Sequence, residues 1–387
     1  MAIPITYNLR HLRQRPGATA MTAVGIALTV AIALFILALL GGLRQAFARS
    51  GQPLNVLVLR KGSTAEVSST VTEQQAALLR TMPGIAKNAA GQPMVSPELV
   101  VVVSLPQRNG AGPNNVTVRG LGRIGRQLRP QVHLVKGRWF HAGQREVDVS
   151  QSVARRYRHA HVGGSIRFGQ GQWRVVGVFA AGNTAPSSEI WGDVHQMQGD
   201  FQRQGVFSSV LLQAASPVEA SALVRRVSSD QQLELHGTHE QAYYAQQTQS
   251  GAPIEFVGWV VALIMAIGSC FAAMNTMYAA VAYREREIGT LRMLGFSRPS
   301  ILGCFVLESL MLAVLGWALA VVAMLPLNGL TTGTMNNATF SEVVFQMKMT
   351  PAVLGWALAF ALLMGLIGGL APAWQAARRE IVSALRA

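Results

Sequence analysis

Residues with the clearest capacity for chemistry gather in one charged segment between two long apolar runs. Residues 283–299 hold Arg284, Glu285, Glu287 and Arg292. Guanidinium and carboxylate groups can form ion pairs and charge-assisted hydrogen bonds with a partner protein. No nucleophile with an acid–base partner accompanies them, so a membrane-bound enzyme is the weakest interpretation. The segment therefore predicts a docking surface.

Residues that could bind a metal or a nucleotide are few. The pairs His159-x-His161 and His236-x-x-His239 lack nearby cysteines or a clear set of carboxylates, so we predict no metal site. The sequence also contains no G-x-x-x-x-G-K-[ST] phosphate loop. Since ATP cannot be bound here through such a loop, we expect the ATPase to be another polypeptide. We predict no catalytic, cofactor-binding or metal-binding residue in this chain.

Four apolar runs predict four transmembrane helices, because about 20 apolar residues cross roughly 30 Å of hydrocarbon. The predicted spans are residues 18–43, 254–282, 301–325 and 352–371. A cleaved signal peptide is the alternative for the first run, but its apolar core is longer than the roughly 7–15 residues of such peptides. We expect it to be retained as a membrane anchor.

Basic residues predict the orientation of the spans, since cytoplasmic loops are enriched in Arg and Lys. Such residues lie in segments 1–17, 283–299 and 372–387, whereas the loop 326–351 has only Lys348. Both termini should be cytoplasmic and the 326–351 loop external. Residues 1–17 also predict a helix in the membrane interface; the alternative is a basic leader that only sets topology.

The net charge of +15 is spread over the chain and is not concentrated in one stripe. Of the 33 basic residues, 20 lie between Gly51 and Ser250 together with 12 acids. This distribution disfavours nucleic-acid binding and favours membrane lipid or an acidic partner. Cys270 and Cys304 fall in separate spans, where we expect both to act as small packing residues. The external domain has no cysteine, so we expect it to fold without a disulfide.

Residues 44–251 predict a large α+β domain between the first two spans. Short β-like runs separated by Gly, Asn and Pro predict strands, and residues 72–81 and 217–227 predict helices. We expect two lobes, about 52–185 and about 200–240, on a stalk that continues the first two spans. The Gln- and Tyr-rich segment 241–249 favours a solvated stalk. The predicted strands are 54–59, 100–105, 115–118, 147–149, 166–168, 173–179 and 208–212.

The charged segment predicts an amphipathic helix. Glu285, Gly289 and Arg292 would share one face, and Ile288, Leu291 and Leu294 another. Gly295 could close this helix before the next begins. The apolar ridge could dock in a groove on a partner, or the charges could only anchor the loop at the lipid headgroups.

The whole pattern of one span, a large external domain and three spans resembles the MacB/FtsX-type permeases of ABC transporters, which include LolC/LolE-like and DevC-like permeases. Residues 284–295 are similar to the family's R-x-x-E-I-G-x-L-R-A-x-G segment, and residues 365–378 to its glycine-rich last span and P-A-x-x-A-A exit. Ile381-Val382 stands where a proline is usual. The resemblance extends to residues 137–149 and 162–179, which are similar to the MacB-type periplasmic core.

The resemblance implies a bacterial inner-membrane permease that binds two copies of a separate ABC ATPase subunit, which would bind ATP and Mg. It also implies a homodimer, or a heterodimer with a similar permease, and allows a periplasmic adaptor and an outer-membrane channel. The implied fold is a four-helix membrane protein with a MacB-like, two-lobed α+β domain on a helical stalk. The implied ATPase-coupling residues are Arg284, Glu285, Glu287, Ile288, Gly289, Leu291, Arg292, Leu294 and Gly295.

Polar and small residues within the spans predict helix contacts. Glu308 is the only acid deep in the last three spans, and it is either a contact that changes between states or a neutral packing residue. Small residues permit close helix approach and fit a dimer: Gly268, Ala272, Gly365, Gly368 and Gly369.

For function, the sequence favours mechanotransmission, since four spans leave little room for a water-filled path. ATP-driven closure of the ATPases would move the external domain, which would export or extrude a substrate. The alternative is an FtsX-like signalling complex that regulates an external partner such as a cell-wall hydrolase.

Overall fold

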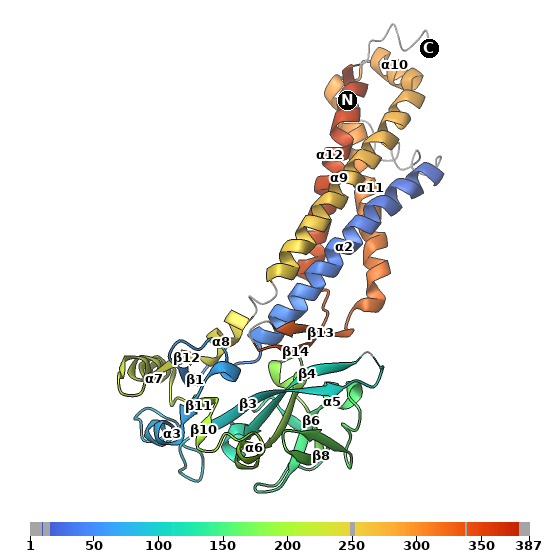
Figure 1. Cartoon of the computed structure of the whole chain (residues 1–387). Coiled ribbons are helices and arrows are strands. Elements are labelled where there is room, and N and C mark those ends of the chain that lie inside the picture. The colour runs from blue at the N-terminus through green and yellow to red at the C-terminus, as the bar shows by residue number, and fades with distance from the viewer. Residues whose placement is uncertain (1–9, 11–15, 111, 248–251, 337–338, 379–387) are drawn as a thin grey trace. The chain divides into compact units, whose positions relative to one another are not determined.

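The computed structural model describes residue 10 and residues 16–110, 112–247, 252–336 and 339–378 (Figure 1). The chain divides into two compact units. The helical unit comprises residues 1–41, 253–330 and 347–387, and the α+β unit comprises residues 42–252 and 331–346. The predicted interfacial helix at 1–17 and the end of the cytoplasmic tail fall almost wholly outside the described residues.

Among the residues that the structure describes, four helices are long and apolar enough to cross a membrane, in agreement with the predicted number. They are α2 (Pro16–Ala48), α9 (Ala252–Tyr283), α11 (Arg298–Met324) and α12 (Pro351–Arg378). Between α9 and α11 lies the short helix α10 (Glu285–Met293), and a 3₁₀ turn, η4 (Leu325–Leu327), follows α11.

Two of these helices extend at least five residues past the C-terminal ends of their predicted spans. The first helix, α2, continues without a break to Ala48, as expected for a stalk. The last, α12, runs past the predicted end at residue 371 and contains Pro372 in its interior. Proline removes one backbone hydrogen bond, but transmembrane helices tolerate it where neighbouring groups compensate.

The α+β unit is built on a ten-stranded mixed sheet (Figure 1). Its order is β12-β1-β11-β3-β4-β9-β6-β8-β5, with β7 also paired to β8. The pairs β4–β9 and β6–β8 are parallel and the rest antiparallel. The strands are β1 (Asn55–Arg60), β3 (Val95–Pro106), β4 (Pro113–Leu121), β5 (His133–Gly137), β6 (Glu146–Ser150), β7 (Ser165–Phe168), β8 (Gly171–Ala180), β9 (Glu189–Asp193), β11 (Ser209–Gln213) and β12 (Leu235–His239).

Short helices and two-stranded ladders complete this unit. The ladders are β2 (Val71–Thr72) with β10 (Val206–Phe207), and β13 (Thr331–Asn336) with β14 (Ser341–Gln346). The helices are α3 (Glu73–Arg80), α4 (Arg123–Gln127), α5 (Gln151–Arg156), α6 (Val194–Asp200), α7 (Pro217–Ser229) and α8 (Glu240–Gln247), with 3₁₀ turns η1 (Glu66–Ser68) and η2 (Ala185–Ser188).

Local sequence explains the elements that were predicted. Thr72 and Gln75 form a capping box at the start of α3, which satisfies two otherwise unpaired N–H groups. Ser216 caps α7, whose first residue is Pro217, a position that suits proline. All seven predicted strands overlap observed strands.

The division into two sequential lobes differs from the structure. Strand β1, assigned to the first lobe, lies between β11 and β12, assigned to the second. One hydrophobic core contains Val56 and Val58 of β1 together with Val147 and Val149 of β6. Pairing between strands more than 150 residues apart leaves no signature in local patterning, so the lobes could not be separated by sequence position.

The prediction of a solvated segment at 241–249 is wrong for one face of its described part, because residues 241, 242, 245 and 246 are exposed and the others are buried. In α8, Tyr243, Tyr244 and Gln247 are buried. The Tyr243 hydroxyl accepts a hydrogen bond from the Glu66 backbone N–H, and Gln247 Nε2 donates to the Thr64 carbonyl. Tyrosine and glutamine therefore find partners inside the unit, as buried polar groups must.

Candidate functional site

The charged segment forms a short helix with defined ends. Arg284 breaks the path between α9 and α10, with φ −99° and ψ 17°. At the other end Gly295 has a left-handed φ of +91°. Its N–H donates to Arg292 O, and the Phe296 N–H donates to Leu291 O, which is the Schellman ending that glycine favours. The sequence anticipated this role of Gly295.

The predicted apolar ridge of α10 does not lie on one face. Ile288 is buried in the core of the helical unit, whereas Leu294 is 68% exposed and Leu291 is intermediate. Residues spaced three apart on a helix rotate backwards by about 60° each time, so the row turns from the core toward the surface. Gly289 is buried beside Ile288, and Glu285 and Arg292 are half-buried.

The exposed surface of α10 thus combines charge with apolar side chains at the C-terminal end. Arg286, Glu287, Thr290, Met293 and Leu294 are exposed. Such a surface can present ionic and apolar contacts to a protein partner.

Arg284 and Glu308 form a buried ion pair that the sequence did not indicate. Arg284 Nη1 and Nη2 donate to the two oxygens of Glu308 at 2.8 and 3.0 Å. Both side chains are almost fully buried, and the guanidinium lies 5.9 Å from the ring centre of Phe305. Arg284 is therefore not exposed on the surface of the helical unit. Instead it fixes the junction of α9 and α10 to α11.

The predicted packing residues separate into two groups. A Cβ at Gly365 would lie 2.7 Å from Ala313 Cβ, and one at Gly369 would lie 2.1 Å from Ser309 Oγ. Gly368 similarly faces Ala273, so these three glycines bring α12 close to α11 and α9. Gly268 and Ala272, by contrast, are exposed on α9.

Hydroxyl pairs also join α2 to α9. Thr22 Oγ1 donates to Thr276 Oγ1 at 3.0 Å, and the Thr29 and Ser269 hydroxyls lie 2.5 Å apart. The two pairs are seven residues apart on each antiparallel helix, so both lie on the same facing surfaces. Interhelical hydrogen bonds of this kind stabilise helix pairs in membranes.

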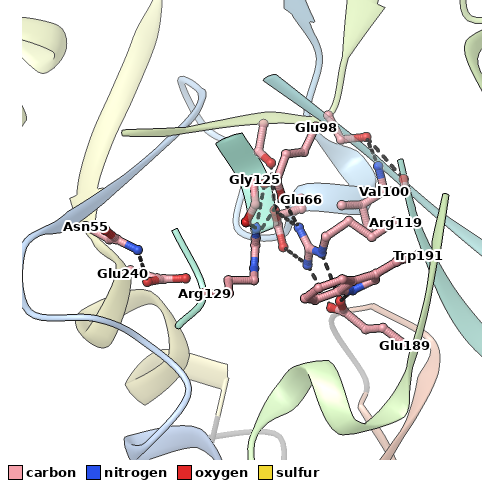
Figure 2. A network of polar contacts seen from close by, with 12 residues as sticks. Asn55, Glu66, Glu98, Val100, Arg119, Gly125, Arg129, Glu189, Trp191 and Glu240 are labelled. Atoms are coloured by element: carbon pink, nitrogen blue, oxygen red, sulfur yellow. Dashed lines mark hydrogen bonds and ion pairs between the residues drawn. The ribbon is translucent and has the colours of Figure 1, made fainter. Parts of the chain in front are cut away.

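A second polar centre lies inside the α+β unit, where Arg119 of β4 bonds three carboxylates (Figure 2). Its guanidinium donates to Glu66 and Glu98 at 2.8 Å and to Glu189 at 2.9–3.0 Å. Arg129 donates twice to Glu98 at 2.7 Å. The network joins η1, β3, β4 and β9 near the middle of the sheet.

Burial and charge act in opposite directions on these carboxyl groups. Burial favours a raised pKa for Glu66, but the charge of Arg119 and hydrogen bonds from Arg119 and Ser209 outweigh it, and the pKa is lowered. At Glu240 of α8, burial dominates and raises the pKa to about 7, although Arg129 and hydrogen bonds from Gln52 and Asn55 oppose it. Glu66 therefore remains ionised while Glu240 titrates near neutrality.

Only a weak sequence signal could have located this network. Glu98 and Arg119 each interrupt an apolar strand run, and charged residues are rarely buried unless paired. The identity of the partners required the fold, since Glu66, Arg119 and Glu189 are far apart in the chain.

Family models match both parts of the chain. Residues 19–229 match the MacB-like periplasmic core domain, and residues 259–381 match the FtsX-like permease C-terminal model. The solved periplasmic region of MacB from Actinobacillus actinomycetemcomitans is 13% identical, covers 49% of this chain and 90% of that structure, and gives a TM-score of 0.37.

Curated relatives include proteins from several bacteria that are called "Macrolide export ATP-binding/permease protein MacB". The one from Bordetella avium is 24% identical over 413 residues, covering 98% of this chain and 59% of the relative. The one from Pasteurella multocida is 26% identical and covers 95% and 57%. This chain thus spans less than two thirds of their length. Because the core-domain match alone extends over more than half of its residues, the chain belongs to the MacB/FtsX-type family of ABC transporter permeases.

Proposed function

We propose that this chain couples ATP hydrolysis by a separate ATPase chain to movement of its α+β unit outside the membrane. The movement exports or extrudes a substrate by mechanotransmission. Neither ATP nor Mg binds to this chain itself.

The observation that carries this proposal is the construction of α10. The helix lies between two membrane spans, exposes Arg286, Glu287, Met293 and Leu294, and is braced at its start by the Arg284–Glu308 pair. A partner that pushes on the exposed side chains would meet a helix whose preceding residue, Arg284, is fixed to α11. Motion of the partner would then be passed to the spans.

The proposed assembly contains two ATPase subunits and two permease chains, as a homodimer or with a similar permease. Exposed Gly268 and Ala272 on α9 would allow close approach of a second copy. The complex would lie in the bacterial inner membrane with both termini in the cytoplasm. A periplasmic adaptor and an outer-membrane channel would complete an export path.

The substrate class to test first comes from the relatives, which are named for macrolide export. Whole cells that contain the chain with its ATPase would be assayed for energy-dependent extrusion of a labelled macrolide. Glu287→Arg and Gly289→Pro should abolish transport because the ATPase no longer docks on α10, while the detached ATPase continues to hydrolyse ATP. Glu73→Arg, which reverses an exposed first-turn acid on α3, is the matched control for Glu287.

The outcomes separate the substrate from the mechanism. Normal transport by both α10 variants would contradict the coupling role of α10. Absence of macrolide transport with an intact, active complex would exclude only that substrate. Capture of a cell-wall hydrolase by the α+β unit, with no transported substrate, would favour a signalling role instead.

A further inference from the structure

The segment between α11 and α12 is a β-hairpin that belongs to the α+β unit. The sequence predicted only an external loop at 326–351, but residues 331–346 form β13 and β14. Val343, Val344 and Phe345 are buried. After α11 the chain therefore enters the α+β unit as this hairpin and then goes back to the helical unit to form α12.

One carboxylate on the hairpin collects three donors from that unit. Glu342 Oε1 accepts from Arg156 Nη2, and Glu342 Oε2 accepts from the Tyr157 hydroxyl and from Asn114 Nδ2 at 2.8 Å each. The Glu342 side chain is 8% exposed. Hydrogen bonds to an ionised, buried group are among the stronger polar contacts in proteins. We call these four residues the hairpin latch.

Backbone and amide contacts align the hairpin beside the latch. The Val344 N–H donates to Ser188 Oγ at 2.7 Å, and the Gln346 N–H donates to Asn183 Oδ1 at 3.1 Å. Asn336 Nδ2 donates to Gln247 Oε1 of α8 at 3.0 Å. The hairpin is thus also tied to α8, the helix that precedes α9 in the chain.

Because Gly333 has no side chain, the Glu342 carboxylate has room to contact Arg156. A Cβ at Gly333 would lie 2.2 Å from Glu342 Oε1 and 3.0 Å from Arg156 Nη1. Gly333 does not have a left-handed φ, so its backbone could accommodate alanine. An alanine side chain would displace the Glu342 carboxylate from Arg156 without removing any charged group.

We propose that the hairpin latch transmits movement between the α11–α12 pair and the α+β unit. The unit is then driven through this hairpin as well as through α2 and α9. The transmission rests on the proposed coupling to ATP hydrolysis, whereas the attachment itself does not. Arg156, Tyr157 and Asn114 act as positioning residues for the hairpin.

The attachment is tested by hydrogen exchange on the full chain in lipid nanodiscs without an ATPase. Glu342→Gln and Gly333→Ala should each speed exchange of the β14 amides by about tenfold or more, as expected when a charge-assisted bond is lost. Controls are Glu219→Gln, a partly exposed paired acid, and Gly122→Ala, a glycine with open space around its Cβ position. If the β14 amides of both latch variants exchange at the wild-type rate, the proposal that the latch holds the hairpin is wrong.

Transmission is tested on the complex with its ATPase, trapped with ATP and orthovanadate. Trapping should change exchange in the β14 segment of the wild-type chain. Both latch variants should lose most of this change while ATP hydrolysis continues. A wild-type response in both variants would overturn transmission. Failure to recover any ATPase would count against the proposed function, and the result from the nanodiscs would still decide the attachment.

Discussion

At the scale of single residues, the pair of Arg284 and Glu308 defines how α10 is held. Two hydrogen bonds join groups that are nearly inaccessible to solvent. Removing one member of a buried ion pair leaves an uncompensated charge, whereas replacing both by apolar residues is often tolerated. The pair should therefore behave as a unit in mutagenesis.

We predict that Arg284→Met and Glu308→Met will each destabilise the helical unit by about 3 kcal/mol or more. The double variant should recover much of that loss, since no unpaired charge remains. Unfolding of the full chain in detergent would measure this cycle. Losses that simply add in the double variant would show that the two side chains do not interact.

Glu240 predicts a pH dependence of the α+β unit. Its pKa is about 7 in the folded chain against an ordinary value of 4.5, so the folded state holds this proton more tightly. Stability should fall as pH rises from about 4.5 to about 7, by at most about 3 kcal/mol from this group. Asp148, whose pKa burial also raises to about 7, adds a second contribution of the same sign.

The test compares unfolding of the full chain across this pH range with that of Glu240→Gln. The variant should retain only the slope due to other groups, and Glu219→Gln, at a partly exposed position, should leave the slope unchanged. An identical slope in wild type and Glu240→Gln would contradict the titration of Glu240.

Sequence reasoning at this scale succeeds where the cause is local. Gly295 could be assigned because a helix ending by a Schellman motif needs a left-handed residue. The partner of Glu308 could not be assigned from the sequence. Arg284 lies 24 positions away, and the two side chains meet only when the junction of α9 and α10 folds against α11. The same limit applies to Arg119 and its three carboxylates.

At the scale of elements, α10 and its C-cap residue provide a pair of aliphatic side chains in opposite environments. Ile288 is 3% exposed and Leu294 is 68% exposed. We predict that Ile288→Ser will destabilise the chain by about 3 kcal/mol. Leu294→Ser should leave stability nearly unchanged but weaken ATPase binding by about tenfold, the effect of losing an interface anchor.

Thermal unfolding and quantitative capture of the ATPase would separate the two effects. Equal loss of ATPase binding in Leu294→Ser and in a well-folded Ile288→Ser would contradict the assignment of faces. Unchanged ATPase binding by Leu294→Ser would show that the exposed apolar residue at the C-terminal end of α10 is not part of the interface with the ATPase.

Elements with a strong local pattern were predictable, and elements defined by their neighbours were not. The valine-rich runs in β3 and β8 and the capped helices α3 and α7 follow from composition and spacing. Strand β12 and the hairpin β13–β14 were missed because their stability comes from pairing and from contacts such as those of Glu342. For the same reason the buried face of α8 cannot be recognised from its Gln- and Tyr-rich sequence.

At the scale of the whole molecule, the chain combines four membrane helices with an α+β unit into which it passes twice. Residues 42–252 form the first passage and residues 331–346 the second. The order of spans and the resemblance at 284–295 and 365–378 were sufficient to predict the family. The second passage was not predicted, since an external loop of 26 residues has no pattern that assigns it to a distant sheet.

The most direct test of coupling to an ATPase is capture of this chain from its native membrane in nanodiscs, followed by mass spectrometry and an ATPase assay. We predict recovery of a soluble ATPase subunit that is lost with Glu287→Arg and retained with the control Glu73→Arg. Failure to recover an ATPase with a folded, intact chain would contradict the account.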